Sequence, residues 1–172
     1  MLLLFFVGCA ATGIFGIGRK IPMNRVNDLG QREGYWRDSV GGGFVYDLYY
    51  KGGKKDGLYK RFYRNKLFLF GEYTADNISG TWYMFGDEGE LRCTIDSIEL
   101  NKDSIYTGYC RIFCKYKCHS IDYYPSGAVK SEGYMVCDEE FEIEIWEIGE
   151  WKYYDESGNL IKTKDYGDRR TP

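Results

Sequence analysis

Several features that would define a helical protein, an enzyme or a nucleic-acid-binding domain are missing from this sequence. The 172 residues include only 3 prolines and a single histidine, and no stretch of about ten residues combines helical periodicity with helix caps. A net charge of −3 lacks the positive excess usual in nucleic-acid-binding domains, so nucleic acid is not an expected partner. The sequence contains no nucleophile elbow, Walker loop or H-E-x-x-H motif. We therefore expect no catalytic residues, no enzyme activity and no cofactor.

Glycine and aromatic residues, by contrast, are abundant and regularly placed. Aromatics make up 18% of the chain, and 17 residues are tyrosine. A glycine two positions before a Trp or Tyr recurs every 23 residues at Gly34, Gly57 and Gly80, and appears again at Gly149, 69 residues or three periods later. A fixed period of about 20 to 50 residues is typical of repeat proteins, in which each unit buries its apolar face against its neighbours.

The two best copies, residues 80–91 and 149–160, align without a gap and predict the structure of one repeat. Each has a glycine, an aromatic-rich run of strand length and a turn rich in Asp, Glu and Gly. Aromatic side chains favour strands, and these turns suit hairpins that place glycine where a positive φ is needed. The sequence therefore predicts an all-β fold, in which about five or six successive antiparallel β-hairpins form an elongated, twisted sheet.

Equivalent positions in these hairpins provide the first set of candidate residues. The repeat aromatics are expected to pack in a row along the sheet, and each repeat glycine is expected to let a neighbouring ring or backbone approach closely. The repeat aromatics are Trp36, Tyr59, Trp82 and Trp151, and the repeat glycines are Gly34, Gly57, Gly80 and Gly149.

The alternation of G-x-W-x-Y-Y-D-x-x-G-x-L with Y-Y-x-x-G-x-x-K-x-x-G resembles the bacterial variant of the membrane occupation and recognition nexus (MORN) repeat. The resemblance covers residues 27–91 and 122–166. It implies a single β-repeat domain over residues 19–172, degenerate at about residues 92–121, that binds a protein partner without catalysis. Because families of this type include antitoxin components, a cytoplasmic antitoxin-like protein that binds a toxin is an alternative. The sequence identifies neither the partner nor the oligomeric state.

A basic segment, residues 51–66, has two interpretations. Its basic side chains alternate with aromatic ones, an arrangement that would contact phosphate groups of an anionic lipid or a nucleic acid. It is also typical of a solvated strand face, where lysines discourage edge-to-edge pairing, and the balanced charge favours this second interpretation. A surface that binds glycan or anionic lipid is therefore a further alternative function. The candidate anion-binding residues are Lys54, Lys55, Lys60, Arg61 and Arg64.

Cys110, Cys114, Cys118 and the adjacent His119 have a spacing that resembles a set of metal ligands. The segment RIFCKYKC is typical of a strand, in which residues four apart stand about 13 Å from each other, too far to share one zinc ion. We expect small buried thiols on one core face instead, and no bound metal. An odd number of cysteines besides Cys9 excludes a complete disulfide framework, although one or two cross-strand bridges remain open.

Residues 1–18 are predicted to be a signal segment of the lipoprotein type. They carry no charge, and their apolar run is short and interrupted by glycines. Gly8-Cys9 resembles the end of a bacterial lipobox, where the cysteine is lipidated and becomes the new N-terminus. The usual basic residue of a signal peptide is missing, which a start codon further upstream would explain; an uncleaved anchor and a cytoplasmic form are alternatives. The favoured function is thus a protein-binding envelope lipoprotein, attached to the membrane through Cys9.

We predict that the gene, expressed in its own host with its upstream codons, yields a mature chain that begins at a lipid-modified Cys9. The intact mass of the mature protein measures this, because cleavage and lipidation both change it. A soluble product that retains residues 1–8 would contradict the lipoprotein and would favour the cytoplasmic antitoxin-like alternative.

Overall fold

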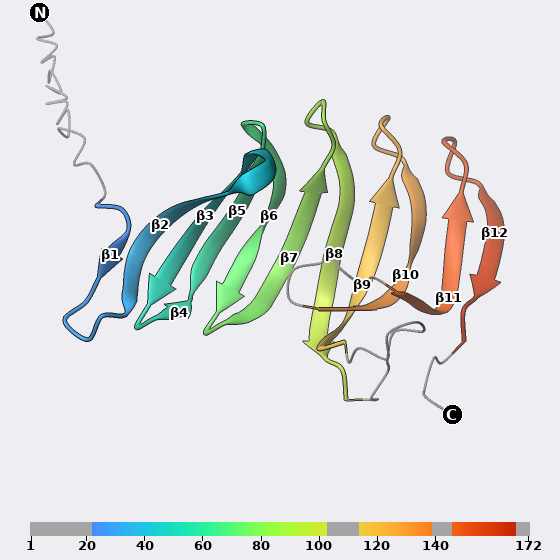
Figure 1. The fold of residues 1–172 in the computed structure, drawn as a ribbon. Coiled ribbons are helices and arrows are strands. Elements are labelled where there is room, and N and C mark those ends of the chain that lie inside the picture. The colour runs from blue at the N-terminus through green and yellow to red at the C-terminus, as the bar shows by residue number, and fades with distance from the viewer. Residues whose placement is uncertain (1–21, 103–113, 139–145, 168–172) are drawn as a thin grey trace, which may run out of the picture.

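The computed structural model describes residues 22–102, 114–138 and 146–167, which form one open antiparallel sheet of 12 strands. Neighbouring strands follow in the order β1-β2-β3-β5-β6-β7-β8-β9-β10-β11-β12, and the short β4 pairs with β3. Figure 1 shows the twisted sheet running from β1 at one edge to β12 at the other, with turns alternating between its two long sides. The predicted all-β fold of successive antiparallel hairpins is confirmed.

The strands are short, and most have a length of seven to ten residues. A 3-10 turn, Gly41–Gly43, links β2 to β3. The strands are β1 (Arg25–Val26), β2 (Arg32–Val40), β3 (Phe44–Lys51), β4 (Lys54–Lys55), β5 (Gly57–Tyr63), β6 (Lys66–Thr74), β7 (Asn77–Phe85), β8 (Leu91–Leu100), β9 (Tyr116–Tyr123), β10 (Val129–Cys137), β11 (Trp146–Tyr154) and β12 (Leu160–Asp165).

Turn residues with left-handed backbone conformations close the hairpins. Gly89 and Gly158 have φ of 85° and 83°, as predicted for the turns of the two best repeat copies. Ala75 and Asp76, between β6 and β7, have φ of 48° and 68°. Two consecutive left-handed residues are typical of a type I′ turn, whose twist matches that of the strands it joins. Local turn chemistry therefore sets where the chain reverses.

A large β-bulge is repeated at the Gly-x-Trp motif. Register shifts place residues 80–82 of β7 opposite the single residue Gly71 of β6. In the same way, residues 149–151 of β11 lie opposite the single residue Gly133 of β10. The first residue of each bulge, Gly80 or Gly149, has a φ of 64° or 59°. A bulge of this kind needs a left-handed residue, which glycine adopts without steric cost.

The bulge lowers each tryptophan ring onto the glycine of the adjoining strand. A Cβ atom added to Gly71 would lie 2.1 Å from Cδ2 of Trp82, and one added to Gly133 would lie 2.5 Å from the ring of Trp151. Each indole N–H donates a hydrogen bond to a backbone carbonyl, at 3.1 Å for Trp82 and 2.8 Å for Trp151. The rings are 0% and 4% exposed. These two repeat aromatics therefore belong to the core.

The prediction that the repeat glycines admit a neighbouring ring or backbone is wrong at three of their four positions. A Cβ atom at Gly34 or Gly149 would meet no atom within 4 Å, and one at Gly80 would meet only a carboxylate oxygen at 3.9 Å. At Gly57 the prediction holds, because a Cβ atom would lie 3.2 Å from the side chain of Tyr49. All four glycines have positive φ. Backbone conformation, rather than space, explains the repeat glycines.

The spacing of 69 residues between Gly80 and Gly149 does not correspond to three repeats. Gly80 lies on β7 and Gly149 on β11, so two hairpin units separate them in the described sheet. Residues 101–115 between β8 and β9, and residues 138–145 between β10 and β11, account for the additional length.

One further copy of the repeat lies between these two, on β9. It is out of phase with the period of 23 residues. Ser120 of β9 pairs with Gly133 of β10, just as Tyr59 of β5 pairs with Gly71 of β6. Residues 118–120 thus take the place of the Gly-x-aromatic motif. The neighbouring register irregularity falls on β8 instead of β9.

One face of the sheet, called the aromatic face below, carries the main apolar cluster, and the centroids of the Tyr59 and Trp82 rings lie 5.4 Å apart within it. Cys114 belongs to a separate cluster with Val136 and Ile148. The prediction that Cys114 shares a core face with Cys118 is therefore wrong, because β9 begins only at Tyr116; Cys110 lies outside the described residues. The buried members of the aromatic face are Leu48, Tyr50, Tyr59, Leu69, Tyr73, Ile78, Trp82, Cys93, Ile95, Tyr116, Cys118, Met135, Cys137 and Trp151.

We predict that Gly71→Ala lowers the free energy of unfolding by about 1–3 kcal/mol, because the added methyl group displaces the Trp82 ring. Trp82→Ala should cost about 3–5 kcal/mol, because removal of the buried ring leaves a cavity. Urea unfolding measures both changes. Gly41→Ala is the control, since a Cβ atom there meets no atom within 4 Å, and it should unfold like the wild type. An equally neutral Gly71→Ala would show that the ring does not lie on this glycine.

Candidate functional site

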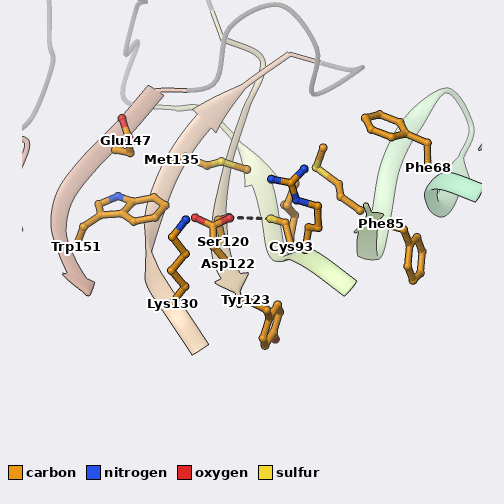
Figure 2. A pocket seen from close by; sticks show the side chains of 13 residues that line it. Phe68, Phe85, Cys93, Ser120, Asp122, Tyr123, Lys130, Met135, Glu147 and Trp151 are labelled. Carbon is orange, nitrogen blue, oxygen red and sulfur yellow. Dashed lines mark hydrogen bonds between the residues drawn. The ribbon is translucent and has the colours of Figure 1, made fainter. Parts of the chain in front are cut away.

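A cavity of about 480 Å³ opens on the aromatic face between β6 and β11 (Figure 2). It lies beside the one copy of the repeat, on β9, that has a serine in place of the repeat aromatic. In the preceding copy the ring of Tyr59 contacts the ring of Trp82, whereas the equivalent Ser120 carries only a hydroxyl group and lines the cavity together with Trp151. The exchange of a ring for a hydroxymethyl group therefore accounts for the space.

The cavity has a buried floor and a charged rim. Arg92 and Lys130 are exposed at the rim, and Asp122 and Glu147 are half-buried. The floor consists of Cys93, Ile95, Ser120, Met135 and Trp151, and the remaining lining residues are Phe68, Met84, Phe85 and Tyr123.

Charges of both signs border the cavity without being paired to one another. Among the described residues, the side chains of Arg92 and Glu147 take part in no hydrogen bond or ion pair. Asp122 accepts a hydrogen bond of 2.8 Å from the Ser131 hydroxyl. The Lys130 ammonium group lies 5.9 Å from the centroid of an aromatic ring. Each of these groups remains able to bind a ligand of opposite charge.

The cavity contains one thiol, that of Cys93. Its sulfur lies 3.3 Å from the hydroxyl oxygen of Ser120, the contact that Figure 2 marks with a dashed line. Burial raises the pKa of Cys93 to about 12, although the hydrogen bond with Ser120 acts in the opposite direction. Because the thiolate is the nucleophilic form, Cys93 is not an activated nucleophile at neutral pH.

The five basic residues predicted to bind anions do not converge on one site. Lys54 and Lys55 form β4 at one long side of the sheet, whereas Arg64 lies in the turn after β5, at the opposite side. Lys60 and Arg61 are consecutive on β5 and point to opposite faces. Arg61 is buried on the aromatic face, with its guanidinium carbon 4.4 Å from the centroid of a phenylalanine ring. The five basic side chains therefore do not form a single anion-binding site.

The repeat aromatics are positioned as structural residues rather than as a binding surface. Tyr59, Trp82 and Trp151 are buried in the main cluster, while Trp36 packs against its edge and is partly exposed. The guanidinium carbon of Arg32 lies 4.5 Å from the centroid of the Trp36 ring. Of the four, only Trp151 lines the cavity of the aromatic face described above.

The opposite face has its own polar group near the N-terminal edge. The guanidinium of Arg37 donates two hydrogen bonds to the Asp47 carboxylate, at 2.6 and 2.8 Å. Tyr35 lies beside this pair, and together with Asp47 it lines a second cavity of about 370 Å³. This bidentate pair orients Asp47, which is almost fully buried, so the group is primarily structural.

The only histidine of the chain is separated from the cavity. His119 and Cys118 are consecutive on β9 and therefore point to opposite faces, as the sequence predicted. The ring of His119 lies 3.5 Å from the Asp96 carboxylate on the face away from the cavity. In the described part of the chain, no group of three His, Cys, Asp or Glu residues is placed to hold a metal ion.

Of the residues that line the cavity, only Trp151 is among the candidate residues predicted from the sequence. Arg92, Cys93, Ile95 and Ser120 lie in residues 92–121, the region in which the repeat pattern fades. The loss of a repeat aromatic could have indicated the cavity from the sequence. However, Ser120 is recognisable as the position of the missing ring only once β9 is paired with β10.

No protein-family model matches this chain, and no curated protein matches it. Within the described residues, no helix has the length and apolar character required to span a membrane.

We predict that Tyr35 ionises with a pKa of about 12, raised from 10.0 by burial and by the hydrogen bond and negative charge of Asp47. Because the folded-state pKa exceeds the unfolded-state value, this contribution to stability is present below pH 10 and is lost as the pH rises to about 12. NMR titration of tyrosine Cζ resonances, assigned with Tyr35→Phe, measures the pKa. Asp47→Asn should lower it, and an unchanged value in that variant would contradict the assigned cause.

Proposed function

We propose that this protein is a non-catalytic protein-binding repeat module and that its partner binds in the cavity beside Ser120. The observation that carries the proposal is that an open cavity with a charged rim replaces a repeat ring at this position. A purely structural repeat does not need such a space, because an unfilled gap on a core face forfeits packing contacts. The gap is therefore best explained by an occupant.

The chemistry of the cavity supports a segment of a protein as that occupant. Met84 and Met135 are flexible thioethers that adapt to an apolar side chain. At the rim, Arg92 and Lys130 suit a carboxylate, and Glu147 suits a basic group. A polypeptide segment with an apolar side chain between acidic and basic residues offers all three partners at once.

The groups available for chemistry support a binding role over catalysis. Cys93 is protonated at neutral pH, as its raised pKa of about 12 requires. The imidazole of His119 points to the opposite face and does not line the cavity, so it is not placed to act as a general base for a bound ligand.

The proposal also includes a family and a location. In both regular copies, the motif glycine begins the same β-bulge and the motif tryptophan ends it. This shared structure supports membership of the bacterial MORN repeat variant. The lipobox-like sequence at Cys9 supports attachment to the cell envelope; residues 1–21 lie outside the described part of the chain.

Site-specific photocrosslinking in the native host tests where the partner binds. A photoreactive phenylalanine analogue at Phe85, a lining residue, should crosslink a protein through a defined peptide. The same analogue at Tyr49, which is 47% exposed and lines the smaller cavity on the opposite face, is the positional control. Equal crosslinking of one protein from both positions would contradict binding in the cavity.

We predict that Ser120→Tyr abolishes this crosslink without lowering the melting temperature, because the new ring fills the cavity as Tyr59 fills the preceding copy. The matched control is Ser39→Tyr, an exposed position on β2, which should leave the crosslink intact. Thermal unfolding separates loss of binding from loss of folding. A stable Ser120→Tyr protein that still forms the crosslink would refute the proposed site.

A further inference from the structure

Two thiols of neighbouring strands are in contact beside the cavity floor. Cys118 of β9 and Cys137 of β10 are both 0% exposed, and their sulfur atoms lie 3.4 Å apart. Both are free thiols in the structure. Met135, which lines the cavity, is the cross-strand neighbour of Cys118. The pair therefore lies directly next to the candidate site, although neither cysteine lines it.

The strand register makes these cysteines diagonal neighbours on one face. Cys118 pairs with Met135, and Cys137 pairs with Tyr116. Diagonal positions lie farther apart than directly opposite ones, but here the two thiol groups point toward each other and their sulfur atoms are 3.4 Å apart. A disulfide requires a sulfur–sulfur distance of about 2.04 Å, so the two sulfur atoms must move closer together than the 3.4 Å of the free thiols.

The other buried cysteines in the described part of the chain are placed differently. The Cys93 thiol contacts the hydroxyl group of Ser120, and Cys114 lies in the separate cluster with Val136. Among the four described cysteines, the sulfur atoms that contact each other are those of Cys118 and Cys137. The geometry thus selects one pair out of the four described cysteines.

We propose that Cys118 and Cys137 form a disulfide that clamps β9 to β10 when the chain folds in an oxidising compartment. The oxidant is a small disulfide such as oxidised glutathione. One cysteine thiolate attacks it and releases one glutathione thiolate, and the second cysteine sulfur then displaces the other from the mixed disulfide. The two protons of the cysteines end on the two glutathione molecules, which are thereby reduced.

The reaction takes place before the strands are fully packed or during their transient opening. Both sulfurs are inaccessible in the folded protein, and the hydrogen bond with Cys118 together with burial raises the pKa of Cys137. Local opening exposes such groups in folded proteins. Once formed, the bond restricts the unfolded chain and holds the strand that carries Met135. The inference does not depend on the proposed function.

The chain offers a direct mass-spectrometric test. Trypsin cleaves after Lys117, Lys130 and Lys152, so the two cysteines fall in the separate peptides 118–130 and 131–152, each with one cysteine. The full-length protein is refolded with reduced and oxidised glutathione, alkylated and digested. We expect the most abundant disulfide to join these two peptides and to disappear after reduction. We also expect the oxidised protein to melt at a higher temperature than the reduced one.

Single variants identify the partners. Cys118→Ser and Cys137→Ser should each remove the linked peptides and the difference in melting temperature, whereas Cys93→Ser should leave both. If a serine variant fails to fold, the peptide map of the wild type decides the question alone. Two results for the refolded wild-type protein would overturn the proposal. One is that Cys118 and Cys137 are both alkylated, and the other is that their disulfides to other cysteines are as frequent as the disulfide between them.

Discussion

The structure depends on the contact between an indole ring and a bare glycine on the adjoining strand. A sheet usually buries its apolar face against a second layer, but in the described part of this chain the apolar face belongs to a single sheet. The aromatic side chains must therefore cover the sheet themselves. The bulge makes this possible, because its extra residues lower the ring of Trp82 or Trp151 across the neighbouring strand, and Gly71 or Gly133 provides the space.

The same constraint explains why a site arises where it does. Every ring that covers the sheet fills space that neighbouring residues do not fill, so the loss of one ring opens a cavity rather than a small defect. Ser120 stands where Tyr59 stands in the preceding copy, and the cavity appears beside it. Surrounding repeats keep their rings and hold the walls in place. Rigid repeats on either side of one degenerate copy thus combine a stable scaffold with a space that is open to a ligand.

The motif glycines and aromatics were sufficient to predict the hairpins, since a local pattern and local turns determine them. The glycines under the rings were not predictable from the sequence. A short turn between β6 and β7 separates Gly71 from the motif glycine Gly80, whereas the longer connection between β10 and β11 separates Gly133 from Gly149. No fixed spacing therefore marks them. Cys114 was misplaced for a similar reason, since the start of β9 at Tyr116 depends on pairing with β8.

A displaced register irregularity explains why a cysteine takes the place of the motif glycine in the degenerate copy. In the regular copies the bulge lies on the motif strand, and its first residue is glycine, which adopts the positive φ there without steric cost. In the pairing of β8 with β9 the irregularity lies on β8, where Ser97 has a φ of 51°. The equivalent position on β9 is then free to carry a side chain, and Cys118 occupies it, in contact with Cys137. Two residues further along, Ser120 replaces the ring. The thiol pair thus follows from the change in strand register, and the cavity follows from the loss of a ring at Ser120 in the same copy.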